Sequence, residues 1–407
     1  MILFFRFKNF RTFQQETLVN MQAASYKELP DHLAVLDCPS GRKGVSGTSS
    51  VSKAAAHSDK KLIKTLAVYG PNASGKSHII AALQFYYDFV NRQLLTPAPD
   101  ALQIRSLLSS YPFLSETPAP DLPNRAGLPL SMCMQFFFQG YLFEYSFTLS
   151  DGEVTEEAFL VNKKVIFQKN MDELRPGKIF QSVIKKTVPL KTKGSSLGTF
   201  LNYHMDEFTE ANQAFVSFFQ QSFLSFDHSC LCRINQFPSF GAVQAKKILE
   251  LPSVGDFIYH HLLALQVPVT FSREEFADKL DPLTCSTGLT KIILLLFRCC
   301  CLQKTGGVLI VDDFTAFLHP NVSRYLLKLF QSPDSQNVQL IFTTHDTALL
   351  NRSQFRRDEV AIVNMNHTGL SHLHTLADIR VRADASFSKD YLAGKYGILP
   401  VWEEPEQ

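Results

Sequence analysis

Four stretches of the chain have the apolar patterns of core strands and helices. Residues 62–69, LIKTLAVY, are apolar and β-capable, and residues 77–90, SHIIAALQFYYDFV, repeat apolar residues at helical spacing. Two further apolar runs, 308–311 and 338–342, each end in polar residues. Such runs are typical of parallel strands that are buried on both faces. The pattern therefore predicts α/β structure towards both ends of the chain.

The middle of the chain has different patterns. Residues 131–170 alternate apolar and polar positions around glycine-containing turns, which predicts an antiparallel meander. Residues 195–280 are richer in helical patterning, and residues 1–25 are expected to form strands. The Ser/Gly/Lys-rich residues 38–60 and the Pro-rich residues 112–130 predict loops, the first of them mobile. A long insertion therefore separates the two α/β parts.

The loop between the first core strand and its helix has a phosphate-binding pattern. The residues from Gly70 to Ser77, GPNASGKS, fit G-x-x-x-x-G-K-[ST] without a mismatch. The two glycines let the backbone curl, so that its N–H groups and the helix N-terminus face an anion. Lys76 can reach the outer phosphates, and the Ser77 hydroxyl can ligate Mg²⁺. Because a strand and a helix flank the loop, we prefer a nucleotide site to a chance match.

Carboxylates and a histidine follow the later strands. Asp312 and Asp313 end the 308–311 run, which is the Walker B arrangement. Asp312 would hold Mg²⁺, and Asp313 stands where a base or water-positioning acid belongs. His345 follows the next strand and could donate a hydrogen bond to a γ-phosphate. An acidic turn and a structural histidine are the plainer alternatives, but the order of these features after the P-loop favours the functional interpretation.

A Ser-Thr-Gly turn, Ser286 to Gly288, opens the helix expected within residues 281–296. One interpretation is a plain helix cap with glycine flexibility. The other is an ABC-type signature turn, in which the serine hydroxyl, the glycine N–H and the helix N-terminus bind the γ-phosphate of a nucleotide held by another subunit. We favour the second.

These motifs divide the chain into four parts. We expect the N-terminal half of an ATPase head at 1–95, a β-rich insertion at 96–194, a helical lid or dimerisation arm at 195–280, and the C-terminal half of the head at 281–407.

Composition excludes several classes of protein. With 407 residues, 45% hydrophobic residues and a net charge of +2, the chain has an ordinary globular composition without strong overall affinity for nucleic acid or membranes. No apolar run reaches the ~18 residues of a membrane span, and the start lacks the features of a signal peptide. Eight cysteines without framework spacing predict a reducing cytoplasm. His228, Cys230 and Cys232 could ligate a metal, but no partner pair with zinc-finger spacing follows.

With these motifs in this order, the sequence resembles ABC-type ATPases of the SMC/RecF kind. More closely, it is similar to the stand-alone ATPases linked to restriction and abortive phage infection, the RloA and AbiL-like group. The P-loop is specific only to the superfamily, whereas the Leu-His-Pro turn and the closing tail narrow the resemblance. The supporting stretches span nearly the whole chain and include FKNFRTFQQETL at 7–18, VYGPNASGKS at 68–77, FLHP at 317–320, TTHDTALL at 343–350 and KDYLAGKYGILP at 389–400.

The resemblance implies an α/β, ABC-type ATPase head with a parallel core sheet, an antiparallel β subdomain and a large β-rich and helical insertion. It implies a dimer or larger ring around sandwiched ATP and Mg²⁺, acting in anti-phage defence beside a separately encoded effector, often a nuclease. The implied catalytic residues are Lys76, Asp313 and His345, and Ser77 and Asp312 would ligate the metal. The implied nucleotide-binding residues are Gly70, Pro71, Asn72, Ala73, Ser74, Gly75, Lys76, Ser77, His78, Ser286 and Gly288.

The chain departs from the family pattern in two places. The family has Glu after the Walker B aspartate, whereas this chain has Asp313, which is one methylene shorter. Drawing a water-positioning carboxylate back by about 1 Å can cost orders of magnitude in rate. Cys285 also stands where an acidic residue is common. Both predict a slow ATPase. Gln135 and Gln139 are weak candidates for the Q-loop glutamine.

Three functions stay open. The first is a slow ATPase switch that controls an effector, and the second is a nucleotide-binding scaffold with negligible turnover. The third is a RecF-like, DNA-binding repair ATPase. A basic stretch could then meet phosphates, although interleaved acids make a solvated surface the plainer interpretation. This stretch comprises Lys163, Lys164, Lys169, Lys178, Lys185, Lys186, Lys191 and Lys193.

Overall fold

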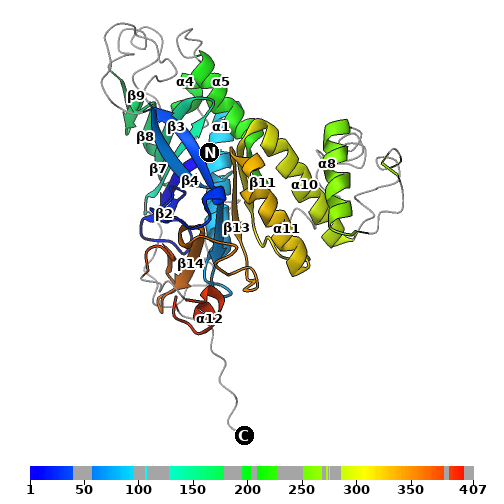
Figure 1. Ribbon diagram of the computed structural model, residues 1–407. Coiled ribbons are helices and arrows are strands. Elements are labelled where there is room, and N and C mark those ends of the chain that lie inside the picture. Colours follow the sequence, from blue (N-terminus) through cyan, green and yellow to red (C-terminus); the bar gives the residue numbers. More distant parts are fainter. Residues whose placement is uncertain are drawn as a thin grey trace.

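The computed structural model describes residues 1–39, 57–95, 106–107, 128–177, 195–202, 209–226, 251–267, 272–273, 275, 286–379 and 385–397. Within these residues the chain forms two large sheets flanked by helices, and a small sheet of β3 (Leu33–Pro39) and β4 (His57–Ile63) (Figure 1). No helix of the described part is long and apolar enough to cross a membrane.

A six-stranded sheet carries the predicted core strands. Its order is β11-β12-β13-β5-β14-β15, with β11 to β14 parallel and β15 antiparallel to β14. Every residue of β5, β12 and β13 is buried, which confirms the strands predicted from continuous apolar runs. The bounds are β11 Phe223–Phe226, β12 Gly307–Val311, β13 Val338–Thr343, β5 Thr65–Tyr69, β14 Val360–Met365 and β15 Ser371–Thr375.

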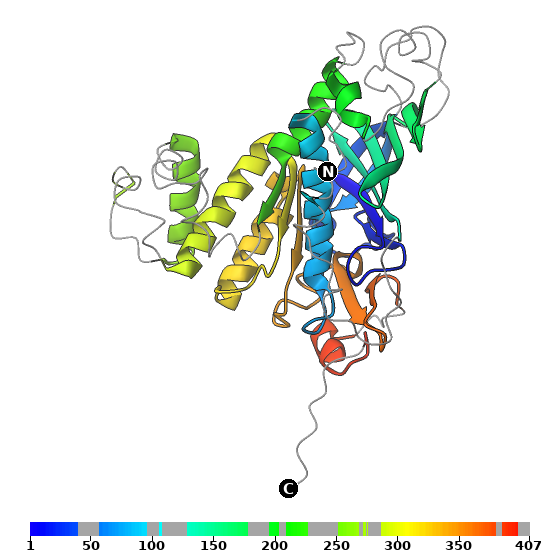
Figure 2. The same cartoon turned by 180° about the vertical axis from the view of Figure 1, so that it is seen from behind.

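Two apolar layers cover this sheet. On one face, α1 (Lys76–Leu95) lies between the two large sheets, and its buried side chains share a cluster with Val308 and Ile310 of β12 (Figure 2). On the other face, Leu309 and Val311 pack with α10 (Thr287–Thr305), α11 (Pro320–Gln331) and α8 (Pro252–Ala264). Alternate residues of one strand thus enter different cores, as strand geometry requires.

The second large sheet is antiparallel throughout, in the order β10-β9-β8-β7-β6-β1-β2. Its strands from β6 to β9 confirm the predicted meander. The meander extends a sheet begun at the N-terminus, because β6 pairs with β1. The bounds are β1 Ile2–Lys8, β2 Thr17–Asn20, β6 Leu130–Phe138, β7 Tyr141–Ser150, β8 Glu153–Val161, β9 Lys164–Asn170 and β10 Glu173–Pro176.

Several sequence expectations need correction. The predicted loops at 38–60 and 112–130 are too long: residues 38–39 end strand β3, residues 57–60 begin strand β4, and residue 130 begins strand β6. Residues 40–56 and 112–127 lie outside the described residues. The predicted helical region also contains β11, an edge strand of the core sheet. The remaining elements are α4 Leu197–Asn202, α5 Thr209–Ser217, α12 Phe387–Leu392, the π-helix Phe218–Ser222 and the 3₁₀ turns Pro30–His32, Pro333–Ser335 and Arg357–Glu359.

Candidate functional site

The P-loop connects the end of β5 to the start of α1, and β5 lies between β13 and β14. Gly70 and Gly75 have φ angles of 153° and 103°, which favour glycine. A Cβ at Gly70 would lie 2.4 Å from the Val363 carbonyl oxygen, so this position also lacks room for a side chain. Across the loop, Lys76 Nζ donates hydrogen bonds to Gly70 O at 2.9 Å and Pro71 O at 2.7 Å. The loop is therefore a closed turn around its lysine.

Three neighbouring strands bring the predicted metal ligands together at their carboxyl ends. Ser77 Oγ donates a hydrogen bond to Asp312 Oδ1 at 3.1 Å, although 235 residues separate them. Thr343, the last residue of β13, donates to the same carboxylate oxygen at 2.5 Å. Because β5, β12 and β13 are adjacent parallel strands, their ends meet at one edge of the sheet. Lys76, Ser77 and Asp312 thus form one cluster.

His345 belongs to the same electrostatic cluster. Burial lowers the pKa of Lys76 to about 8, although Asp312 and Asp313 act to raise it. Desolvation also lowers the pKa of His345; Lys76 lowers it further, and Asp313 and Asp312 oppose the shift. At pH 7 the lysine is therefore mostly charged, and the imidazole is neutral and can donate one N–H.

Asp313 occupies a left-handed backbone position, with φ 54°. Its N–H donates to Thr343 Oγ1 at 2.8 Å, and its carbonyl oxygen accepts from Lys291 Nζ at 2.7 Å. The same ammonium donates to Ala316 O at 3.1 Å and is only 1% exposed; burial lowers its pKa to about 8. Lys291 of α10 thus fixes the turn after β12. The sequence carries one weak signal for it, a lysine directly before the apolar run 292–297.

Ser286 and Gly288 lie at the start of α10. Ser286 is the N-cap, and its Oγ accepts a hydrogen bond from Leu289 N at 3.4 Å. A Cβ at Gly288 would lie 2.7 Å from the carbonyl oxygen of Phe317, a residue that is 57% exposed. In the described part of this chain, neither Ser286 nor Gly288 makes a hydrogen bond with residues 70–78. Ser286 is exposed and Gly288 is half-buried, in a turn separate from the chain's own P-loop.

The P-loop is also contacted by residues for which the sequence predicted no role at the site. Thr12 Oγ1 is 2.8 Å from Nδ1 of His78, whose pKa is lowered to about 4 by burial and, further, by Arg11. Ser371 Oγ donates to Ser74 O at 2.6 Å. From the tail, the hydroxyl of Tyr391 makes a hydrogen bond with the Gly70 backbone. Thr12 and Tyr391 belong to the stretches 7–18 and 389–400 that support the resemblance, but neither stretch predicted a contact with the P-loop, which only the fold shows.

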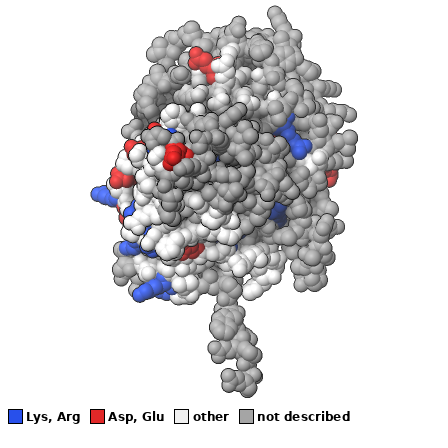
Figure 3. All heavy atoms as spheres, turned by 90° about the vertical axis from the view of Figure 1, so that its right-hand side faces the viewer, with Lys and Arg blue, Asp and Glu red and all other residues white. Residues whose placement is uncertain are grey.

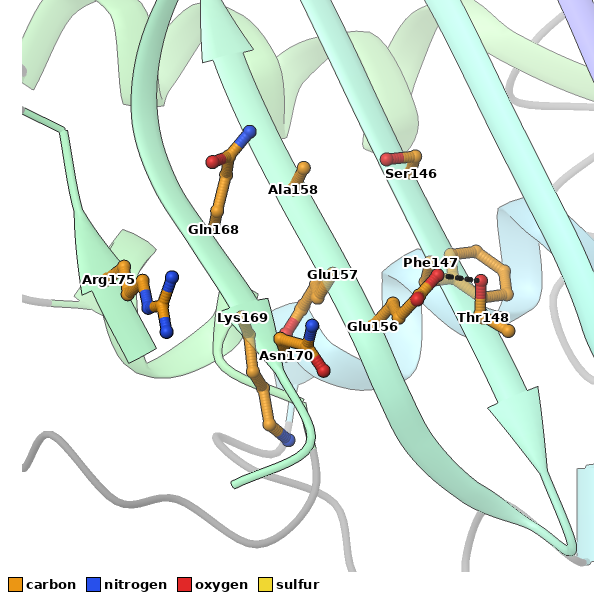
Figure 4. Close-up of a pocket in the computed structure, with 10 residues that line it drawn as sticks. All are labelled: Ser146, Phe147, Thr148, Glu156, Glu157, Ala158, Gln168, Lys169, Asn170 and Arg175. Carbon is orange, nitrogen blue, oxygen red and sulfur yellow. Dashed lines mark hydrogen bonds between the residues drawn. The ribbon is translucent and has the colours of Figure 1, made fainter. Parts of the chain in front are cut away.

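The structure describes three of the eight lysines in the basic stretch considered for DNA binding. Lys169 is 4% exposed, lies opposite Glu157 in the β8–β9 register and donates to Val154 O, so it is not a surface phosphate contact (Figure 4). Lys163 and Lys164 lie at the β8–β9 turn, and the other five lysines lie outside the described residues. On the face seen in Figure 3, the described acidic and basic side chains are interspersed.

Two further candidates do not join the cluster. Gln135 Nε2 donates to Glu144 Oε2 at 2.6 Å within the antiparallel sheet, and Gln139 lies in the turn between β6 and β7. His228, Cys230, Cys232 and Cys285 lie outside the described residues. Among the residues that are described, no group of three or more His, Cys, Asp or Glu side chains could hold a metal ion.

Comparison with family models gives one match, which covers part of the chain. Residues 211–351, about a third of the chain, match the family described as "AAA domain, putative AbiEii toxin, Type IV TA system". No curated protein matches the chain. The matched segment includes β12, the two aspartates and His345, but not the P-loop.

Solved structures of SMC heads are similar to the chain. An Smc head bound to the C-winged helix domain of ScpA has 10% identity and a TM-score of 0.49, covering 92% of this chain and 97% of that one. The SMC head domain from Thermotoga maritima has 14% identity and a TM-score of 0.43, covering 93% and 99%. An Smc head from Pyrococcus furiosus, bound to the C-terminal domain of ScpA, has 10% identity and a TM-score of 0.43, covering 97% and 98%.

The chain's own strand order and P-loop define its fold. It is an α/β fold with a P-loop between β5 and α1, in which a mainly parallel core sheet is joined to an antiparallel sheet.

Proposed function

We propose that this protein is a slow ATPase switch that binds MgATP at the P-loop, closes a dimer around it and controls a separately encoded effector in anti-phage defence. The observation that carries the proposal is the 3.1 Å contact between Ser77 Oγ and Asp312 Oδ1. It joins the P-loop to the Walker B strand beside a buried, charged lysine, which is the arrangement that phosphoryl transfer needs.

The residues at this contact fit a magnesium ion. Mg²⁺ prefers oxygen ligands and usually takes one or two from the protein, with the rest from phosphates and water. Ser77 and Asp312 offer a hydroxyl and a carboxylate oxygen, and they would hold the ion. When bound, Mg²⁺ would neutralise charge on the phosphates. The small number of protein ligands agrees with a cation that arrives with the nucleotide.

The chain's own residues would perform distinct tasks around the γ-phosphate. Lys76 would neutralise phosphate oxygens, and neutral His345 would donate a hydrogen bond. Asp313 would orient the attacking water, because its carboxylate lies near enough to Lys76 and His345 to raise the pKa of both.

The exposed turn at the start of α10 supports an ATP-dependent dimer. Ser286 offers a hydroxyl at a helix N-terminus, where an anion is favoured, and Phe317 beside it exposes an aromatic surface. A second copy of the chain would bring its Ser286 and Gly288 to this chain's nucleotide. Such a dimer would form only when ATP fills the space between the two turns.

The defence role comes from similarity and is the least direct part of the proposal. The description of the family that matches residues 211–351 names a "putative AbiEii toxin" and a "Type IV TA system". The long-lived ATP state predicted from Asp313 would suit a protein that holds an effector, such as a nuclease, in one state until ATP is hydrolysed. The protein would then work in the cytoplasm.

Three measurements on purified protein test the proposal. Titration with a fluorescent ATP analogue and Mg²⁺ should give saturable binding, which Lys76→Ala should abolish. Light scattering should show the mass rising from 45.9 kDa to twice that value when ATP is added, and Ser286→Arg should prevent the rise without abolishing binding. Phosphate release should be slow but measurable, and lost in Asp313→Asn.

The alternative is a nucleotide-binding scaffold, which the short carboxylate of Asp313 favours. Binding and dimerisation with no phosphate release in any variant, Asp313→Glu included, would replace the ATPase with this scaffold. Absence of ATP binding to the unmodified protein would refute both functions.

A further inference from the structure

A chain of buried polar groups connects the back of the P-loop to two distant segments. Ser371, the first residue of β15, places its Oγ 2.6 Å from Ser74 O and 2.7 Å from Thr12 Oγ1. Thr12 Oγ1 in turn lies 2.8 Å from His78 Nδ1. Ser371 and Thr12 are 2% and 5% exposed, and the Ser371 N–H also donates to Thr12 O at 2.9 Å. The two hydroxyls are thus fixed in place by backbone as well as by side-chain contacts.

The Ser371 hydroxyl is the donor in both of its side-chain contacts, so its single hydrogen is shared between Ser74 O and Thr12 Oγ1. Thr12 Oγ1 and His78 Nδ1 also lie within hydrogen-bond distance, and the tautomer of His78 decides which of the two donates.

This chain fixes one peptide group of the P-loop. The carbonyl of Ser74 and the N–H of Gly75 belong to the same peptide unit, and in a trans peptide they point to opposite sides. Ser371 holds the carbonyl towards β15, so the Gly75 N–H points away from β15. Gly75 lies directly on this pair, since a Cβ there would be 2.5 Å from Ser371 Oγ and 2.9 Å from Thr12 Oγ1.

We propose that Ser371 and Thr12 are positioning residues for nucleotide binding, which hold the Ser74–Gly75 peptide so that the Gly75 N–H faces the phosphates. The inference rests on the proposed binding of ATP at this loop. An anion held by backbone N–H groups depends on their orientation before it arrives, because every peptide that must turn on binding weakens the affinity. Neither residue needs to touch the nucleotide.

Two pairs of variants test the inference by titration with a fluorescent ATP analogue and Mg²⁺. Ser371→Ala removes the anchor and should raise Kd about tenfold, the effect of about one oriented hydrogen bond. Its control is Ser335→Ala, because Ser335 is also a buried serine that donates to a backbone carbonyl, that of Leu329, outside the P-loop. Thr12→Val keeps the shape but not the hydroxyl and should weaken binding severalfold, whereas Thr12→Ser should restore it. Equal Kd values for Ser371→Ala and Ser335→Ala would overturn the inference.

A spectroscopic measurement separates positioning from general stability. In protein labelled with ¹⁵N-histidine and free of nucleotide, the His78 signal, identified by its loss in His78→Gln, should change in Ser371→Ala, because Thr12 Oγ1 then loses the hydroxyl that donates to it. The signal should not change in Ser335→Ala. An unchanged His78 signal in Ser371→Ala would refute the connection between these three residues.

The proposed function and this inference fail in different ways. If the unmodified protein and Lys76→Ala both fail to bind ATP, the proposed function fails, and the positioning role fails with it. If the unmodified protein binds ATP and Ser371→Ala binds equally well, only the positioning role is wrong.

Discussion

Replacing Asp313 with Glu changes the reach of one carboxylate at a strained backbone position, so the structure predicts two opposed effects. Glu extends the carboxylate by one methylene, a distance of more than 1 Å. Misplacement of a reacting group by ~1 Å can cost about 100-fold in rate, equivalent to roughly 2.7 kcal/mol. We therefore expect phosphate release to become about 10- to 100-fold faster.

The opposed effect comes from the backbone. Asp313 has φ 54°, and Asp is accepted in the left-handed region more readily than Glu. We expect Asp313→Glu to lower the free energy of unfolding by about 0.5–1 kcal/mol. This strain is present in both the ground state and the transition state, so it should reduce stability without reducing the rate. The gain in rate is then the larger effect.

Phosphate release at saturating ATP, measured beside urea unfolding, separates the two effects. Asp313→Asn keeps the size of the side chain without its charge and should abolish release. Asp313→Gly relieves the strained φ and should be at least as stable as the unmodified protein, but inactive. The reasoning is refuted if Asp313→Glu is no faster than the unmodified protein while Asp313→Asn retains its full rate.

Three further predictions concern stability. Lys64→Met should lower the free energy of unfolding by about 3 kcal/mol, because the buried ammonium donates to three backbone carbonyls. Burial lowers the pKa of Lys64 below 10.5, so the folded chain releases this proton at a lower pH than the unfolded chain. Raising the pH through that interval should therefore increase the free energy of unfolding of the unmodified protein, and with it the difference from Lys64→Met. A difference that becomes smaller would contradict this. Glu157→Gln should lower the free energy of unfolding, measured in urea, by about 3–5 kcal/mol, since the buried carboxylate accepts four hydrogen bonds (Figure 4). Glu156→Gln, at the exposed neighbouring residue, should lower it by under about 0.5 kcal/mol, and equal decreases would be inconsistent with this account. Gly397 has φ 151°, and a Cβ there would lie 2.0 Å from Asn364 Oδ1. Gly397→Ala should therefore displace the tail and speed its limited proteolysis. An unchanged cleavage rate would show that the tail tolerates the side chain.

Local patterns predicted the parts of the fold that depend on contiguous sequence. The strand, loop and helix around the P-loop, the strand before Asp312 and the meander from β6 to β9 all follow from periodicity and glycine positions. The start of a helix at the turn from Ser286 to Gly288 was also predicted, although the sequence favoured a signature turn over the plain cap seen at Ser286. The motifs also predicted that Lys76, Asp312 and His345 would converge, because the carboxyl ends of parallel strands share one edge.

Other features depend on distant contacts and left little trace in the sequence. β11 is four residues within a phenylalanine-rich run that resembles a helix, and it becomes a strand because it pairs in parallel with β12. Tertiary pairing here overrides a weak local preference. Lys291, Ser371 and Thr12 are single residues of common type, and what each holds is determined by where the topology places it.

The position of β5 between β13 and β14 limits how the protein can be divided. A fragment cut at residues 211 and 351 would contain β11, β12 and β13 but not β5 or α1. The cut would leave β13 as an open edge, with unpaired backbone groups and an uncovered apolar face, and such edges promote aggregation. Recombination or gene truncation can therefore preserve this protein only if the glycine-loop segment and the acidic-strand segment are kept together.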